Sequence, residues 1–141
     1  MFHNVKIRSF EKIQSKEEFA LVCEKIIGLN LKQEKIEVIE DINKGFENKN
    51  IYVYTCTITK KRQVKSFIKN LNEAIIDKSF INQENRLDDY LRFFLRLDKK
   101  ALKKEIFELV EHGDCYHITM QVAAYPKKKD VAREVIKEVF K

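Results

Sequence analysis

Glycine and proline are scarce in this chain. Its 141 residues include three glycines, one proline and no tryptophan. So few glycines exclude a phosphate-binding glycine loop, and no Gly-x-Ser-x-Gly turn of a serine hydrolase occurs. The paired acids along the chain fall at predicted helix starts or turns, where helix capping and solvation explain them. We therefore expect neither an enzyme nor a cofactor.

Linkers and repeats are missing as well. No stretch rich in serine, glycine or proline interrupts the sequence, and no segment repeats. A length of 141 residues with 44% hydrophobic residues is enough to build one core. We therefore expect a single domain over residues 1–141.

Disulfide frameworks and membrane spans are not predicted. The three cysteines, Cys23, Cys56 and Cys115, are far apart and odd in number, which favours reduced thiols. The first ten residues carry Lys6 and Arg8 and too few apolar residues for a secretory signal. No apolar run approaches the roughly 18 residues that a membrane span needs. These features predict a cytoplasmic protein with no membrane partner.

Hydrophobic periodicity is present and predicts strands and helices in mixed order. Period-two patterns and runs of β-branched or aromatic residues predict strands at 3–10, 35–42, 51–59, 91–98, 106–111 and 115–124. Helical spacing predicts helices from a Ser15/Glu18 capping box to Gly28, over 61–76 and over 128–140, with a short one at 99–104. Residues 43–50 indicate a turn, and 77–90 are ambiguous, a loop with one helical turn.

This order of elements predicts an α+β fold, β-α-β-β-α-β-(short α)-β-β-α. Gly113-Asp114 suits the two-residue turn of a hairpin between the last two predicted strands. Antiparallel strands with helices between them favour a two-layer sandwich, in which helices cover one face of a mainly antiparallel sheet. The other face is then left for water or a partner.

Charge is distributed unevenly along the chain, whose formal net charge is +6. Residues 11–41 hold five lysines against eight acids, whereas 58–72 hold five basic residues and no acid, and 92–104 hold six against one. The basic residues of these two stretches are the candidate RNA contacts: Lys61, Arg62, Lys65, Lys69, Arg92, Arg96, Lys99, Lys100, Lys103 and Lys104. Lys61, Lys65 and Lys69 are four apart and share one helix face, where like charges cost about 0.2–0.5 kcal/mol per pair. Phosphate would offset that cost, although an ordinary solvated face of a lysine-rich protein is an equal alternative.

The open face of the predicted sheet is a second candidate surface. If the leucines of 91–98 point towards the helices, then Arg92, Phe94 and Arg96 point away from them. The same alternation places Lys6, Arg8 and His117 outward, together with Thr119 and Gln121. Basic residues interleaved with an aromatic suit a surface that stacks bases and binds phosphates. A homodimer interface through the same face is the competing interpretation.

A possible metal site is the group His112, Cys115 and His117. The predicted hairpin places all three near one another, and such side chains bind zinc. With one sulfur and no clear fourth ligand beyond Asp114, a polar hairpin tip is the favoured interpretation and we expect no metal.

The last third of the chain resembles a known family. Leu95-Arg96-Leu97-Asp98-Lys99, then Val122-Ala123-Ala124-Tyr125-Pro126-Lys127 and a closing amphipathic helix, are similar to small archaeal proteins described as predicted RNA-binding, exosome-associated subunits. The strand with Arg8 followed by Ser15-Lys16-Glu17-Glu18 also fits. The resemblance implies a fold related to double-stranded-RNA-binding domains or to the ribosomal protein that holds 5S RNA. It implicates Arg96, Asp98, Lys99, Tyr125, Pro126 and Lys127. The acidic first half and the His112, Cys115, His117 group depart from the family.

Two functions follow as hypotheses. The first is a non-catalytic RNA-binding accessory protein in RNA processing or ribosome assembly, with RNA and an exosome-type complex as partners and phosphates as the main contacts. The second is a dimeric protein–protein adaptor that binds no RNA.

Overall fold

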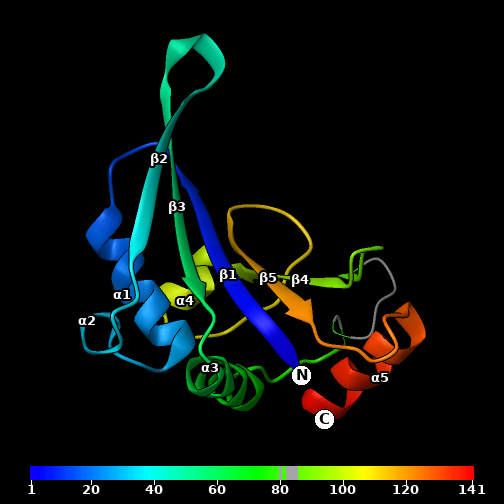
Figure 1. Ribbon diagram of the computed structural model, residues 1–141. Coiled ribbons are helices and arrows are strands. Elements are labelled where there is room, and N and C mark those ends of the chain that lie inside the picture. The colour runs from blue at the N-terminus through cyan, green and yellow to red at the C-terminus, as the bar shows by residue number, and fades with distance from the viewer. Residues whose placement is uncertain (80, 82–85) are drawn as a thin grey trace.

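The fold, seen in a computed structural model, is a five-stranded sheet covered on one face by helices (Figure 1). Residues 1–79, 81 and 86–141 are described. The elements in chain order are β1 Phe2–Glu11, α1 Lys16–Ile27, α2 Leu31–Glu34, β2 Val38–Lys44, a 3-10 turn Phe46–Asn48, β3 Asn50–Ile58, α3 Lys61–Ala74, β4 Arg92–Asp98, α4 Lys99–Lys103, β5 Cys115–Val122 and α5 Lys129–Val139. The predicted α+β class and two-layer arrangement are confirmed.

The sheet has the strand order β2-β3-β1-β5-β4, and every neighbouring pair is antiparallel. Alternation along the central strand β1 buries Val5, Ile7 and Ser9 and exposes Lys6 and Arg8. The buried side chains face the helices, because successive residues of a strand point to opposite faces. The other face carries Lys6 and Arg8, and no helix of the described residues covers it.

The core lies between the sheet and the helices. Phe67 and Leu71 of α3 are fully buried, as are Ile26 and Ile27 of α1. The ring of Phe140, next to α5, lies 6.1 Å from the ring of Phe93, between centroids, so the last helix packs on the same face of the sheet. One contiguous hydrophobic cluster joins these elements. No helix in the described ranges is long and apolar enough to cross a membrane.

The predicted hairpin around Gly113 is wrong. β5 pairs with β1 and β4 and not with the segment 106–111. Both edges of β5 are therefore occupied, and 106–111 reaches only the outer edge of β4 through an isolated bridge between Leu109 and Leu97. The predicted strand at 106–111 is therefore wrong beyond this single bridge, because alternation of apolar residues does not specify a pairing partner.

Smaller corrections concern the first half. Ser15 stands at the N-cap position of α1, yet its hydroxyl donates to the carbonyl of Ile13 at 3.2 Å and no capping box forms. Its backbone N–H instead donates to the hydroxyl of Tyr54 at 2.8 Å. The second strand begins three residues later than predicted, because the unpredicted helix α2 precedes it. Asn30 caps α2 by accepting from the N–H of Gln33 at 3.0 Å.

Residues 80 and 82–85 of the ambiguous stretch 77–90 lie outside the described residues.

Candidate nucleic-acid interface

The open face of the sheet carries a row of two arginines and one histidine across three of its five strands, β1, β5 and β4. In the pairing register, Arg8 of β1 lies opposite His117 of β5, and His117 lies opposite Arg96 of β4. Directly paired residues on one face of an antiparallel sheet have Cβ atoms about 4.5–5.5 Å apart. The register thus places two guanidinium groups on either side of one imidazole.

A second and a third row continue this surface towards the start of β1. Lys6 lies opposite Thr119, which lies opposite Phe94. One step further on, Gln121 lies opposite Arg92. The expected outward direction of Arg92, Phe94 and Arg96 is therefore confirmed, since Leu95 and Leu97 between them are buried in the core. We call the side chains Lys6, Arg8, Arg92, Phe94, Arg96 and His117 the open-face cluster.

Most of the charge in the open-face cluster is not neutralised within the protein. Among the described residues, neither Lys6 nor Arg8 has an ion-pair partner. Arg96 donates from Nη1 to the backbone carbonyl of Glu111 at 2.7 Å, which orients the guanidinium without cancelling its charge. Arg92 is the exception, because its Nε lies 2.7 Å from a carboxylate oxygen of Asp88.

The pKa of His117 reflects this concentration of positive charge. Burial lowers the pKa of the imidazole below its ordinary value of 6.5, and the nearby charges of Arg96, Lys99 and Arg8 lower it further. Each of these positively charged neighbours disfavours protonation of the imidazole, because protonation would add another positive charge beside it. The neutral imidazole lies edge-on to the ring of Phe10, with centroids 5.4 Å apart.

Two aromatic rings flank a cation at the start of the edge strand β4. The guanidinium carbon of Arg92 lies 5.3 Å from the ring centroid of Tyr90 and 6.0 Å from that of Phe94. Both distances are within the range of cation–π attraction. Tyr90 is 75% exposed, so its ring is accessible to a further stacking partner. We call Tyr90, Arg92 and Phe94 the edge ladder.

The helix ridge predicted from the basic stretch 58–72 is present. Lys61, Lys65 and Lys69 are all exposed along α3, whose buried face includes Val64, Phe67, Ile68 and Leu71. Arg62 differs from the three lysines, because its guanidinium is hydrogen-bonded to both carboxylate oxygens of Glu34. This hydrogen bond lowers the pKa of Glu34. The pair ties α3 to α2 and removes Arg62 from the free charge of the ridge.

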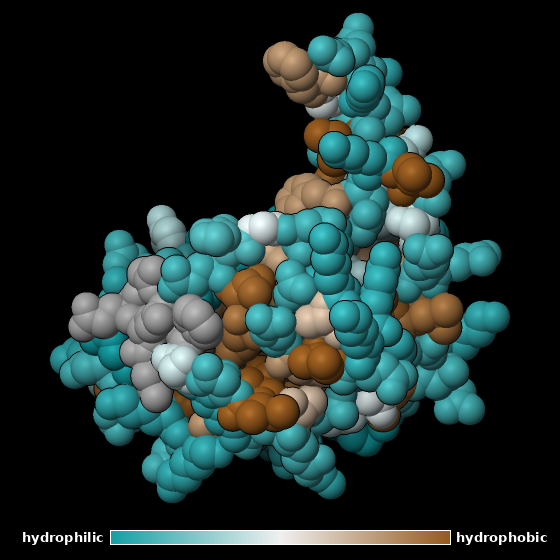
Figure 2. All heavy atoms as spheres, turned by 180° about the vertical axis from the view of Figure 1, so that it is seen from behind, coloured by the Kyte–Doolittle hydropathy of each residue, from teal (hydrophilic) through white to brown (hydrophobic). Residues whose placement is uncertain are grey.

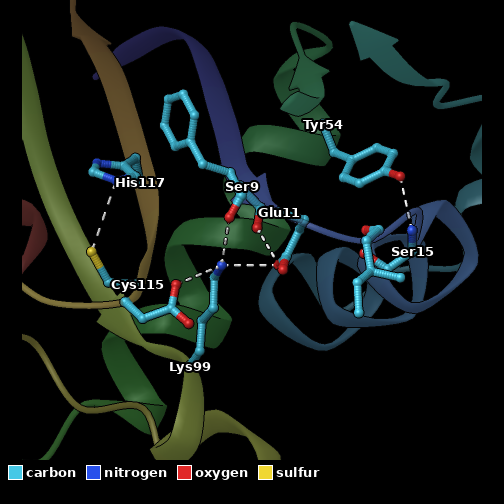
Figure 3. A network of polar contacts seen from close by, with 10 residues as sticks. Ser9, Glu11, Ser15, Tyr54, Lys99, Cys115 and His117 are labelled. Atoms are coloured by element: carbon cyan, nitrogen blue, oxygen red, sulfur yellow. Dashed lines mark hydrogen bonds and ion pairs between the residues drawn. The ribbon is translucent and has the colours of Figure 1, made fainter. Parts of the chain in front are cut away.

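The third basic group, on α4, divides into one inward and three outward side chains. Lys100, Lys103 and Lys104 are exposed. Lys99 is 7% exposed, and its ammonium lies 2.9 Å from Glu11, 2.8 Å from Asp114 and 3.1 Å from the carbonyl oxygen of Phe10. Figure 3 shows this ammonium at the centre of the three oxygens. Asp98 begins the helix by accepting from the N–H of Ala101 at 2.9 Å.

The group weighed as a metal site is only partly assembled. The sulfur of Cys115 lies 3.9 Å from Nε2 of His117, while His112 is exposed on the preceding loop (Figure 3 shows the first two). Within the described residues no three His, Cys, Asp or Glu side chains converge as a metal site would require. Burial raises the pKa of the Cys115 thiol, which keeps it protonated.

Two residues at or beside the open face, Tyr90 and His3, were not among the candidate residues predicted from the sequence. Tyr90 fell in the ambiguous segment, although it continues the alternation of Arg92 and Phe94 by two residues and could have been read from that. His3 lies where the register between β1 and β5 shifts, between Phe2 and Asn4. Nothing in the local sequence marks such an irregularity.

Together, the fold and the open-face cluster define an α+β protein that presents a basic, aromatic-bearing sheet surface. Residues 7–123 match the model of a family described by its RNA binding, and the chain belongs to this RNA-binding family. An RNA-binding protein of Pyrococcus abyssi is 27% identical over 145 residues, which cover 96% of this chain and 92% of the relative. The resemblance to an archaeal RNA-binding family is thus confirmed.

Solved structures share the fold over the whole chain. A DUF54 protein from Methanothermobacter thermautotrophicus has a TM-score of 0.79 and 26% identity, covering 100% of this chain and 99% of that one. A second DUF54 structure, from Archaeoglobus fulgidus, has a TM-score of 0.81 at 19% identity and covers 99% of both chains. At that identity it supports the fold alone.

Proposed function

We propose that this protein binds RNA on the open face of its sheet, mainly through phosphate contacts. The observation that carries the proposal is the row Arg8, His117 and Arg96. It places two guanidinium groups, which have no carboxylate partner among the described residues, on one face on either side of His117. Guanidinium groups bind phosphate through two parallel N–H donors. Membership of the RNA-binding family and the name of the Pyrococcus relative support the same ligand.

The proposed contacts extend beyond the row. Lys6 and Phe94 lie beside the row. Additional phosphate contacts are the lysines of the α3 ridge and the outward lysines of α4. Arg62 and Lys99 are left out of this contact set, because their charges are satisfied by carboxylates inside the protein. Phe94 supplies a ring on which a base can stack.

The charge of the open face disfavours the alternative of a homodimer formed through it. A two-fold interface sets the same patch against itself. Arg8 and Arg96 of one copy would then be desolvated beside those of the other, with no carboxylate of the patch to compensate. Like charges brought together in this way cost several kcal/mol. RNA supplies the opposite charge and avoids the cost.

Binding assays on charge-removing variants test the proposal. In fluorescence anisotropy with labelled RNA at low salt, the double substitution Arg8→Gln and Arg96→Gln is expected to weaken binding by about tenfold or more, since hydrogen bonds to charged groups contribute about 1.5–3 kcal/mol each. The matched control is Lys49→Gln, which removes an exposed charge at the tip of the β2–β3 hairpin. No RNA binding by the wild type, or equal affinity of the double variant and the wild type, would refute the proposal.

The cellular role follows from the family resemblance. We infer that the protein acts as a non-catalytic, cytoplasmic accessory subunit in RNA processing or ribosome assembly, with an exosome-type complex as partner. Affinity purification of the tagged protein from its native cells, with and without ribonuclease, tests this role. Recovery of exosome subunits that survives ribonuclease is expected. Recovery of neither exosome nor ribosomal components would contradict it.

A further inference from the structure

A hollow lies at the end of the open face where β1 begins and β5 ends. Its volume is about 460 Å³. It is lined by His3, Asp89, Tyr90, Leu91, Gln121, Val122, Ala124 and Lys127. Hollows of roughly 300–1,000 Å³ with a few convergent polar groups are typical of sites for small organic ligands. We call it the sheet-end pocket.

The polar groups of the sheet-end pocket are held in place by hydrogen bonds. The side-chain amide of Gln121 donates from Nε2 to the backbone carbonyl of Tyr90 at 2.8 Å. Its Oε1 therefore remains as an acceptor. The backbone N–H groups of Tyr90 and Arg92 both donate to Asp88, at 3.0 and 2.8 Å. These bonds fix the turn that carries Tyr90 against the end of the sheet.

The sheet-end pocket is continuous with the open-face cluster. Tyr90 belongs both to its lining and to the edge ladder, whose next members are Arg92 and Phe94. A strand of RNA that stacks along the edge ladder therefore reaches the pocket without leaving the protein surface. Lys127 adds a positive charge on its rim, and Asp89, which is ion-paired with Lys129 at 2.9 Å, adds a carboxylate.

We propose that the sheet-end pocket holds one unpaired nucleotide of the bound RNA, an inference that rests on the proposed function. The base stacks on Tyr90 and donates from an amino or imino group to Oε1 of Gln121. Its phosphate lies at Lys127, and a ribose hydroxyl donates to Asp89, whose negative charge keeps phosphate from that end. A base inside a duplex is stacked on both sides and paired at its edge, so only an unpaired base can enter.

A second hollow links the sheet-end pocket to the α3 ridge. It measures about 310 Å³, shares His3 with the pocket, and includes Lys61 and Lys65 in its lining. The two hollows thus adjoin at His3, near the start of β1, with the lysines of the ridge on one side and Tyr90 of the edge ladder on the other. An RNA chain that places one nucleotide in the pocket has positive side chains ahead of it and behind it.

Affinities for single-stranded and duplex RNA distinguish this site from general electrostatic binding. For an unstructured oligouridylate, Tyr90→Ala is expected to weaken binding by about fivefold or more, as stacking of one base on an aromatic ring contributes about 1–3 kcal/mol. For a blunt duplex of the same length, Tyr90→Ala is expected to change nothing. Phe46→Ala, which removes a ring that is 89% exposed at the hairpin tip, is the control for loss of an exposed aromatic.

A second pair of variants tests the phosphate contact. Lys127→Ala is expected to weaken binding of the oligouridylate more than Lys128→Ala, although both lysines are exposed and adjacent. In nuclear magnetic resonance, uridine 5′-monophosphate is expected to shift the amide signals of Tyr90 and Gln121. If the wild type binds RNA but Tyr90→Ala is indistinguishable from Phe46→Ala, or weakens duplex and single strand equally, the pocket proposal is overturned while RNA binding stands. If the wild type binds no RNA, the proposed function itself fails.

Discussion

The basic residues differ in whether a carboxylate of the protein neutralises their charge. Lys99 is almost completely buried between β1, α4 and the loop before β5, and its ammonium contacts Glu11 and Asp114 (Figure 3). Burial alone would lower the pKa of Lys99, but its hydrogen bonds to Asp114 and Glu11 outweigh burial and raise it. Lys99 therefore ties the sheet to the loop at Asp114, while its sequence neighbour Lys100 points into solvent.

Replacing Lys99 by methionine is expected to lower the free energy of unfolding by about 1–3 kcal/mol, because the partly buried carboxylate of Glu11 loses its partner. Urea unfolding followed by circular dichroism measures the change. Lys100→Met is the control and is expected to stay within about 0.5 kcal/mol of the wild type, as exposed substitutions usually do. Equal effects of the two substitutions would show that the buried ion pairs contribute no stability.

The raised pKa of Lys99 also fixes the sign of a pH effect. A group whose pKa is higher in the folded than in the unfolded state stabilises the fold fully below its unfolded value, here 10.5. That stabilisation is lost as the pH rises through the folded value. The stability difference between the wild type and Lys99→Met is therefore expected to shrink as the pH rises above about 10.5.

If RNA binds at the proposed open-face site, His117 is expected to make its affinity depend on pH. Its lowered pKa leaves the free imidazole neutral at pH 7, and a phosphate beside Arg8 and Arg96 would raise that pKa. RNA affinity is therefore expected to increase as the pH falls from 7.5 towards 5.5, by about tenfold for each pKa unit gained on binding. Anisotropy titrations measure the trend. In His117→Gln the trend is expected to flatten, while His112→Gln retains it; an unchanged slope in His117→Gln would place the phosphate elsewhere.

At the level of elements, periodicity was sufficient where one face of a strand or helix is buried. The alternation of Val5 and Ile7 and the apolar stripe of α3 predicted β1 and α3 to within a few residues. Partner choice was not predictable in the same way. The sequence of 106–111 and 115–124 fits a hairpin, yet 115–122 pairs with β1 and β4, and 106–111 makes only an isolated bridge to β4. Three segments distant in sequence, β1, β5 and β4, had to be adjacent before the row Arg8, His117 and Arg96 existed. The residues of the open-face cluster were therefore predicted, but their register was not.

The β2–β3 hairpin extends beyond the rest of the sheet. β1 ends at Glu11 opposite Tyr52, so the pairs from Asn43 with Ile51 to Lys44 with Asn50 have no third strand beside them. Figure 2 shows this part projecting from the body, with hydrophobic side chains exposed between hydrophilic ones. Ile42 is 53% exposed and Phe46 is 89% exposed. We call residues 42–51 the arm.

Backbone amides of the arm are expected to exchange with solvent much faster than those of β1. Isolated two-stranded hairpins are marginally stable in water, so the arm opens without unfolding of the core. Hydrogen exchange followed by mass spectrometry is expected to show low protection for a peptide from the arm. Peptides that contain residues 5–9 or 116–120 are expected to exchange only through global unfolding. Equal protection of the two regions would mean that the arm is supported by contacts along its whole length.

For the molecule as a whole, charge is separated by surface and not only by sequence. The acid-rich residues 11–41 form α1, α2 and most of β2. On the open face and the α3 ridge, by contrast, the basic residues other than Arg92 lack carboxylate partners among the described residues. The net charge of +6 therefore understates the positive potential at the proposed interface. A surface of this kind attracts a polyanion from a distance, and salt screens the attraction.

The salt dependence of RNA affinity is the whole-molecule measure of how many phosphates this protein contacts. For single-stranded RNA, log K decreases as log salt increases. The magnitude of this slope is expected to decrease by about 0.7 for each phosphate contact that is lost. Arg8→Gln with Arg96→Gln, and separately Lys65→Glu with Lys69→Glu, are each expected to reduce the slope by about 1.4 if both side chains bind phosphate. The sheet-end pocket and the hollow beside the α3 ridge share His3, so one RNA chain can reach both surfaces. For an RNA long enough to span them, the quadruple variant is expected to show the sum of the two decreases in slope. A short RNA should show only the open-face loss. If the ridge pair leaves the slope of the long RNA unchanged, the ridge is an ordinary solvated helix face and the open face alone binds RNA.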